Sequence, residues 1–235
     1  MAAMKKSDEP AAERPAKAFS SEVATGSRKE NASKQESGAP FRSHRNGTGP
    51  RAADRIRASA AELFYREGIR AVGVDEVVDR AGVTKPSLYR SFASKDDLAA
   101  AYMRDYEANF WENFEKPGGK SYADPREHVL AYIKVLSARA VATGYRGCGL
   151  TNATVEYPAR DNPARQVAEA HKKLFRKRLR ELAALMGARH PAMLGDALLL
   201  LIEGIYVTGQ QSEEGPAQSA LTVARLLIDA GVAKP

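Results

Sequence analysis

The sequence predicts an all-α protein with a small N-terminal head of short helices and a larger C-terminal helical body. Apolar residues recur at helical spacing from Arg51 onward, and glycine or proline stands at the ends of the periodic segments. Neither strand-like alternation nor an internal repeat stands out in the sequence. These observations favour helices in both parts of the chain.

The 235 residues divide into three parts by composition and pattern. Residues 1–50 are rich in Ala, Ser, Gly and Pro and carry nine Lys or Arg against six Asp or Glu. Such a segment buries too little apolar surface to offset the entropy lost on ordering, so we expect a disordered basic tail. Residues 51–111 form the predicted head, and residues 112–235 form the predicted body.

Cysteine content and the length of apolar runs exclude several protein classes. Cys148 is the only cysteine, so no intramolecular disulfide framework or thiolate zinc cage can form. No apolar segment typical of secretion follows Lys5 and Lys6, and the longest apolar run, Ala197–Ile202, is too short to span a bilayer. We therefore expect a cytoplasmic protein with no membrane partner and no cofactor.

The first two helices have clear ends in the sequence. Ile56, Ala60, Leu63 and Phe64 form one apolar stripe on a helix that ends at Gly68. A second helix is predicted between a capping residue at Gly73 and a stop at Gly82, with acidic residues in its first turn. Its predicted inward-facing residues are Val74, Val77, Val78 and Ala81.

A short third helix follows and opens at Thr84, a residue that can cap it. Pro86 stands in its first turn, where no backbone donor is lost, and Leu88 and Phe92 must both face the core. Two helices joined by a short turn around Gly82 form the unit that many DNA-reading proteins use.

The remaining helices connect the head to the body and then build the body. A fourth helix is predicted to begin after Ser94 and to run towards Trp111. Beyond the break at residues 117–119, a glycine-rich loop is expected over Gly144–Asn152. Proline-opened helical stretches are predicted over Pro125–Thr143, Pro163–Met186, Pro191–Gln210 and Pro216–Val232.

The run Val77–Phe92, followed by Ser94–Leu98, resembles the helix-turn-helix head of the TetR family of transcriptional regulators. The match covers about fifty residues without a gap and combines the Ala-Gly-Val turn, the Leu-Tyr pair, the buried Phe and the Ser-Lys start of the next helix. One departure is Gly73, because the family usually has Ser or Thr at this cap. The resemblance implies a DNA-binding regulator that is a homodimer.

The exposed face of the third helix carries the candidate DNA contacts. Lys85 and Ser87 lie at the N-terminal end, which meets base edges in such heads. Tyr89 and Lys95 resemble the family's phosphate contacts, and Arg90 could join either set. The alternatives are a half-buried packing role for Tyr89, a solvated cap for Lys95 and a plain surface charge for Arg90. The candidate DNA-binding residues are Thr84, Lys85, Pro86, Ser87, Tyr89, Arg90 and Lys95.

The resemblance also implies a dimer and a small-molecule effector that respaces two heads on a palindromic operator. The last two helices are the expected dimer surface, through Leu198, Leu199, Leu201, Ile202, Ile205, Tyr206, Leu221, Val223, Leu226, Leu227 and Ile228; the alternative is that they form the monomer's core. The candidate effector-binding residues, which plain core packing would also explain, are Tyr106, Phe110, Trp111, Phe114, Tyr132, Leu136, Tyr157 and Phe175.

Two further features leave alternatives open. Cys148 follows Arg146 in a glycine-rich segment, so redox or electrophile sensing stands beside an ordinary packing role. The basic run that begins at His171 and Lys172 and extends to Arg180 could attract an acidic partner, although a solvated helix face explains it as well.

Function classes other than a regulator find little support. The chain lacks a phosphate-binding glycine loop, a Gly-x-Ser-x-Gly elbow and a His-Glu-x-x-His pair, and its four histidines are scattered, so we expect no catalytic and no metal-binding residues. A non-specific architectural DNA protein acting through the basic tail is a second alternative. We expect a repressor that a ligand releases from DNA, with an activator of the same family as the alternative.

Overall fold

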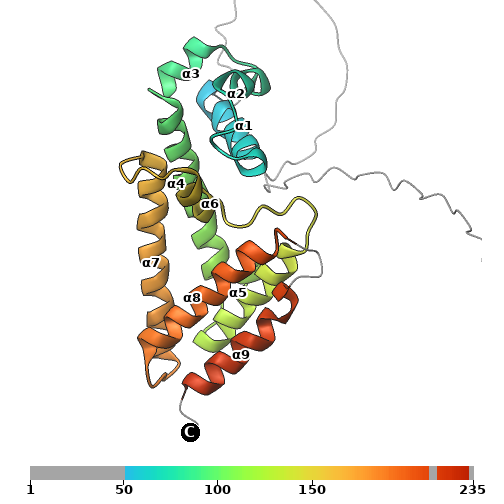
Figure 1. Cartoon of the computed structure of the whole chain (residues 1–235), viewed down its shortest axis with the longest axis vertical. Helices are drawn as coiled ribbons and strands as arrows, with labels where there is room; N and C mark the ends of the chain where they lie inside the picture. Colours follow the sequence, from blue (N-terminus) through green and yellow to red (C-terminus); the bar gives the residue numbers. More distant parts are fainter. Residues whose placement is uncertain (1–50, 212–215, 233–235) are drawn as a thin grey trace, which may run out of the picture. The chain divides into compact units, whose positions relative to one another are not determined.

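The computed structural model describes residues 51–211 and 216–232, without the side chains of Pro216 and Gln218. The all-α prediction is confirmed, because the described residues form helices and their β-type pairing is a single bridge between Ala188 and Val232 (Figure 1). The expected basic tail, residues 1–50, lies outside the described residues.

The head consists of helices α1 (Ala52–Glu67), α2 (Val74–Ala81) and α3 (Lys85–Ser91). The chain leaves α2 through Gly82, whose φ of 60° and ψ of 44° are left-handed and whose N–H donates to the carbonyls of Asp79 and Val78. Glycine adopts this conformation without the steric cost that a Cβ brings. Buried Ile56 on α1, Val77 on α2 and Leu88 on α3 join the three helices in one core.

Helix α4 (Lys95–Glu115) belongs to both parts of the described chain. Its N-cap is Ser94, whose side chain accepts a hydrogen bond from the backbone N–H of Asp97 at 3.0 Å. Leu98 and Met103 near its start are fully buried, as is Phe114 near its end. Since α4 packs against both α1 and α7, a shift of its axis would reach the head directly.

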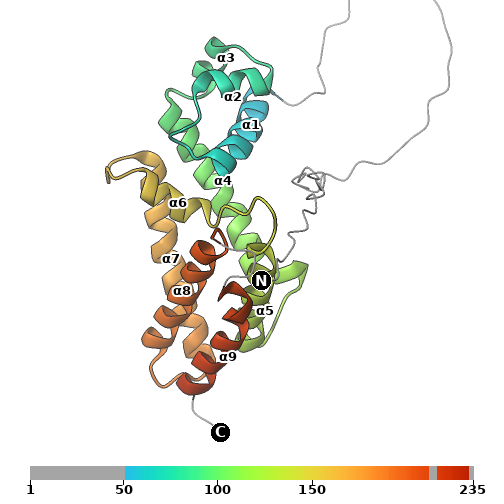
Figure 2. The same ribbon diagram turned by 45° about the vertical axis from the view of Figure 1, so that its right-hand side comes forward.

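In the part of the body that the structure describes there are five α-helices and two short 3₁₀ turns. The chain packs α5 against α8 and α9, and α7 against α4, α6 and α8 (Figure 2). The elements are η1 (Pro117–Gly119), α5 (Pro125–Ala140), α6 (Gly149–Glu156), α7 (Pro163–Leu185), α8 (Pro191–Thr208), η2 (Pro216–Ser219) and α9 (Ala220–Gly231).

The predicted loop over Gly144–Asn152 is wrong in its second half, because α6 begins at Gly149. A Cβ at Gly149 would lie 3.0 Å from the Tyr102 hydroxyl and 3.0 Å from the Tyr106 ring. This glycine therefore allows a helix to approach α4 closely, whereas the prediction took it as a helix breaker. The last predicted helix also differs at its start, where η2 precedes α9.

Helix α8 is long and apolar enough to cross a membrane by length and composition alone, and about a third of that stretch is buried (33%). Leu198, Ile202 and Ile205 on this helix are at most 1% exposed and belong to the core. Core helices of water-exposed proteins pass the same compositional test. Its buried face accounts for part of this apolar character, and Met193, Leu200 and Val207 on its exposed face account for more of it.

Candidate nucleic-acid interface

Helix α3 presents its polar face to solvent and its apolar face to the head. Leu88 is fully buried, whereas Thr84, Lys85, Pro86 and Arg90 are exposed. Ser87 is half-buried, and Phe92, expected in the core, is only partly buried against it. The Tyr89 side chain is 51% exposed, which argues against a packing role for its ring.

The exposed polar side chains of α3 bond to one another and to α2. Lys85 Nζ lies 2.6 Å from Asp75 Oδ1, and this hydrogen bond raises the pKa of Lys85 above its usual value. Ser87 Oγ accepts from Arg90 Nη2 at 2.9 Å and lies 3.1 Å from Thr84 Oγ1. Because exposed polar contacts of this kind are weak, DNA can exchange them for contacts to bases and phosphates.

Lys95 occupies the first position of α4, next to the link between α1 and α2. Its Nζ donates to the backbone carbonyl of Arg70 at 3.3 Å, and burial lowers its pKa below the usual value. Asp96 and Glu156 favour the charged form, and Arg70 disfavours it. The phosphate-contact role of Lys95 stays a prediction, and it requires the ammonium to share or leave this carbonyl.

A contact between the head and α6 was not foreseen from the sequence. The backbone N–H of Arg70 donates to Glu156 Oε2 at 2.9 Å, and Arg70 Nη1 donates to the Glu156 carbonyl at 3.3 Å. The Tyr157 hydroxyl donates to Asp96 Oδ1 at 3.3 Å. The C-terminal end of α6 is therefore bonded both to the α1–α2 link and to the start of α4.

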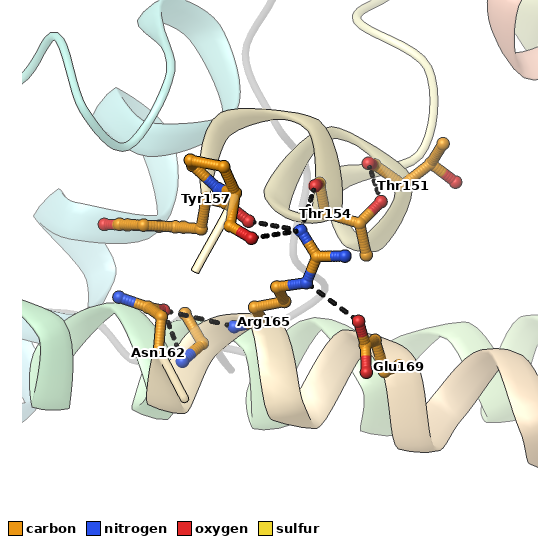
Figure 3. Close-up of polar contacts among 8 residues, drawn as sticks. Thr151, Thr154, Tyr157, Asn162, Arg165 and Glu169 are labelled. Atoms are coloured by element: carbon orange, nitrogen blue, oxygen red, sulfur yellow. Dashed lines mark hydrogen bonds and ion pairs between the residues drawn. The ribbon is translucent and has the colours of Figure 1, made fainter. Parts of the chain in front are cut away.

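Arg165 on α7 holds that same end of α6 from the other side (Figure 3). Its Nη1 donates to the carbonyls of Thr154, Tyr157 and Pro158 at 3.1, 2.5 and 3.3 Å. Its Nε donates to Glu169 Oε1 at 2.8 Å. The last carbonyls of a helix have no hydrogen-bond donors within the helix. This guanidinium provides the missing donors and so joins α6 to α7.

The structure brings together five of the eight residues predicted to bind an effector. Phe110, Trp111, Phe114, Tyr132 and Phe175 form an aromatic cluster with ring centroids 4.9–6.4 Å apart.

The three other predicted effector residues lie apart from this cluster or add no ring to it. Tyr106 stacks on Tyr65 at 6.3 Å, and Tyr157 is half-buried at the contact with the head. Leu136 is buried in the core.

The aromatic cluster also contains His171, which the sequence reasoning assigned to a solvated basic face. The side chain of His171 is fully buried, so that assignment is wrong for this residue. The exposed part of the basic run begins at Lys173, and Arg176 and Arg180 both bond to Asp196 on α8. The helical position of His171, four residues before Phe175, is the signal that could have placed it inside.

Cys148 is 1% exposed and forms the N-cap of α6. Reactive cysteines are partly exposed in electropositive surroundings, and buried ones are inert. Burial thus favours the packing role over redox or electrophile sensing.

Several residues predicted at a dimer surface belong to the core of the chain. Leu198, Ile202, Ile205, Tyr206 and Ile228 are at most 5% exposed, because they fill the contacts among α5, α8 and α9. Of the residues predicted at that surface, Val223 and Leu226 are exposed, and α8 also exposes Met193, Leu200 and Val207, which the prediction did not name.

Comparison with known proteins identifies the head. Residues 56–102 match the family described as bacterial regulatory proteins, tetR family. The HTH-type transcriptional activator FasR of Mycolicibacterium smegmatis is 36% identical over 76 residues, which are 32% of this chain and 34% of FasR. The HTH-type transcriptional repressor BdcR of Escherichia coli is 38% identical over 55 residues, 23% of this chain and 28% of BdcR. The chain thus matches about a third or less of the length of these curated relatives.

Solved structures extend the similarity to the body. A TetR-family transcriptional regulator from Streptomyces coelicolor has a TM-score of 0.73 and 28% identity, over 77% of this chain and 96% of its own. A tetR-type transcriptional regulator from Streptomyces avermitilis has a TM-score of 0.71 and 28% identity, over 77% of this chain and 98% of its own. Residues 56–102 are therefore a TetR-type helix-turn-helix head, and over 77% of its length the chain is similar in fold to TetR-family transcriptional regulators.

Proposed function

We propose that this protein is a homodimeric, sequence-specific DNA-binding regulator of transcription whose affinity for its operator is controlled by a small molecule. The observation that carries the proposal is the exposed polar face of α3, which lies on a helix-turn-helix whose apolar face is buried through Leu88. Such a face fits the major groove. A regulator of this kind works on DNA, so we place it in the cytoplasm.

A dimer is proposed from the exposed face of α8. Met193, Leu200 and Val207 follow one another at intervals of seven residues and are 66%, 73% and 47% exposed. Residues seven apart lie on one stripe of a helix, as at the seam between two packed helices. Val223 and Leu226 extend the exposed apolar surface onto α9. A second copy of the chain is the occupant that we propose for this stripe, which would set two α3 helices on two half-sites.

Control by a ligand is proposed through α6. Glu156 bonds the end of this helix to the α1–α2 link, Tyr157 bonds it to the start of α4, and Arg165 bonds it to α7. A ligand that binds one arrangement of the body better than another would move α6 and α4, and with them the heads. The coupling equals the ligand's difference in affinity for the two arrangements.

We propose that the protein is a repressor: it blocks transcription while it occupies its operator, and ligand binding releases it from the DNA. BdcR is named a repressor and FasR an activator, so activation is the competing sign. A reporter gene behind the operator distinguishes them. Deleting the regulator raises expression from the reporter if it represses and lowers expression if it activates.

The DNA-binding proposal is tested by titrating purified protein against labelled duplexes from the DNA around its own gene. We expect binding to one fragment that is at least a hundredfold tighter than to a scrambled fragment at the same salt concentration, as for specific regulators. Equal affinity for both fragments with a steep salt slope would instead support the architectural alternative.

A further inference from the structure

His171 is a buried polar side chain whose hydrogen-bonding capacity is unused. It lies on α7, is 0% exposed, and neither ring nitrogen has a hydrogen-bond partner among the described residues. Glu107 Oε1 comes within 3.4 Å of Nδ1 but without hydrogen-bond geometry. Buried polar groups are nearly always paired, since an unpaired one weakens the fold, so this exception calls for an explanation.

The surroundings of His171 are aromatic on several sides. Its ring centroid lies 4.4 Å from Phe110, 5.4 Å from Trp111 and 6.0 Å from Phe175. Burial, with a smaller contribution from Lys172, lowers the pKa of His171 to about 3, so the ring is neutral at neutral pH. A neutral imidazole has one donor and one acceptor nitrogen.

The cluster has one ring at its edge. Trp111 is partly exposed, while Phe110, Phe114, Tyr132 and Phe175 are at most 8% exposed. On the outside, Trp111 borders a surface hollow of about 290 Å³, which is also lined by Leu174, Lys177, Arg178 and Glu181. Trp111 Nε1 makes only a long hydrogen bond of 3.4 Å, to Glu107 Oε1. Movement of this ring would join the hollow to His171.

We propose that His171 is the hydrogen-bonding group of the effector site and that the effector is an uncharged, flat aromatic molecule with a hydroxyl group. This inference rests on the proposed ligand control and names the ligand class. The hydroxyl both donates and accepts, so it can use a nitrogen of His171 and the nearby carboxylate of Glu107 together. The aromatic part replaces or stacks between the rings of the cluster.

Charge on the ligand is disfavoured by the same surroundings. A charged group loses its hydration among apolar rings, which is costly unless a partner of opposite sign replaces the water. An anion would face the Glu107 carboxylate, and Lys172, whose charge acts on His171, is already paired with Glu203. A cation would be attracted by the ring faces and by Glu107, but it would have to pass Lys177 and Arg178 at the hollow and would lie near Lys172.

The test compares two probes of the same shape, p-cresol and p-xylene, which differ by a hydroxyl in place of a methyl group. Binding is followed by the fluorescence of Trp111, the only tryptophan in the chain. In the native protein we expect p-cresol to bind about tenfold more tightly than p-xylene, as for one buried hydrogen bond gained. In His171→Phe the two probes should bind with equal affinity.

Thermal unfolding of the same variant supplies a second, independent result. His171→Phe removes unpaired polar atoms from an aromatic cluster, so its Tm should be equal to or above that of the native protein. His128→Phe is the matched control, because buried His128 does have a partner, the Phe114 carbonyl, 2.7 Å from its Nε2. The control should lose several degrees of Tm.

Four results would overturn the inference. They are no binding of p-cresol, equal binding of both probes to native protein, a preference retained in His171→Phe, and tighter binding of the cation phenyltrimethylammonium than of p-cresol. A fall in Tm for His171→Phe as large as that of His128→Phe would contradict the unpaired state of His171. Operator binding without ligand is measured separately. Failure of the effector inference therefore leaves the DNA-binding proposal intact, and failure of operator binding leaves the probe-binding result intact.

Discussion

The backbone N–H of Arg70, in the head, is bonded to the carboxylate of Glu156, at the end of a body helix, at 2.9 Å. Gly68 lies at the same contact, where its φ is 97° and a Cβ would be 3.3 Å from Glu156 Oε2. Arg70 and Glu156 are 86 positions apart in the sequence. Their hydrogen bond ties the link between α1 and α2 to α6, so a movement of α6 would displace that link. Lys95 bonds to the same link.

Replacing Glu156 by Ala should loosen the head without unfolding the chain. The amide of Arg70 loses its acceptor, so hydrogen exchange at residues 69–72 should become faster while exchange in the core of α7 stays unchanged. Glu156→Gln is the matched control, because its amide oxygen can still accept the bond. Equal exchange rates in Glu156→Ala and native protein would show that the contact does not hold the link in solution.

Replacing Arg165 should destabilise the body more than an ordinary surface change does. The guanidinium bonds to three carbonyls and to Glu169, and its side chain is only 17% exposed. We expect Arg165→Ala to lower the free energy of unfolding by about 1–3 kcal/mol, measured by urea denaturation. Arg165→Lys should recover only part of the loss, since an ammonium cannot span the same carbonyls. Full recovery with lysine would contradict the geometric account.

The two proposed sets of DNA contacts should respond differently to mutation. Tyr89→Ala and Lys95→Ala should weaken binding to all duplexes about equally, and Lys95→Ala, which removes a positive charge, should also flatten the salt dependence. Lys85→Ala and Ser87→Ala should instead change base preference. Lys173→Ala, an exposed lysine on α7, serves as the control. Retained operator affinity in Tyr89→Ala and Lys95→Ala would remove both from the interface.

Acid should destabilise the native protein more than the His171→Phe variant. The pKa of His171 is lowered to about 3 in the fold, against an ordinary value of 6.5. The unfolded chain therefore binds one more proton in this range, so stability falls as pH drops from about 6.5 towards 3. By about pH 4 the difference between the two proteins should change by ~3 kcal/mol. Parallel stability profiles would contradict the neutral, buried state of this ring.

A charge in the exposed stripe of α8 should separate the proposed dimer into single chains. Leu200 is 73% exposed in the single chain and stands between Met193 and Val207 on that stripe. Leu200→Glu should shift the mass in solution, measured by light scattering, from two chains to one, because an unpaired buried carboxylate is costly. Val155→Glu, at an equally exposed apolar residue of α6, should leave the mass unchanged. If Leu200→Glu and Val155→Glu were both monomeric, or both dimeric, the dimer interface would not be the stripe on α8.

The head could be predicted almost entirely from sequence because its signals are local. Gly82, Thr84 and Ser94 each mark a helix end within one or two turns of the residues they affect. Helix α6 was missed because Gly149 serves a contact with Tyr102 and Tyr106, which lie more than forty positions away.

The connection between head and body was missed for the same reason. Arg70, Glu156 and Arg165 look like ordinary surface charges in the sequence, and only the fold brings them together. The burial of His171 was not predicted, because the neighbouring Lys and Arg residues indicate a solvent-exposed helix face, although this one position faces inward.

The most direct test of the account is selection of bound duplexes from a random-sequence pool with purified native protein at fixed salt. In the proposed dimer two α3 helices are related by twofold symmetry, so the selection should recover an inverted repeat whose half-sites are one helical turn or a multiple apart. Recovery of no common sequence, with affinity that depends on salt alone, would contradict the claim that the exposed face of α3 reads DNA.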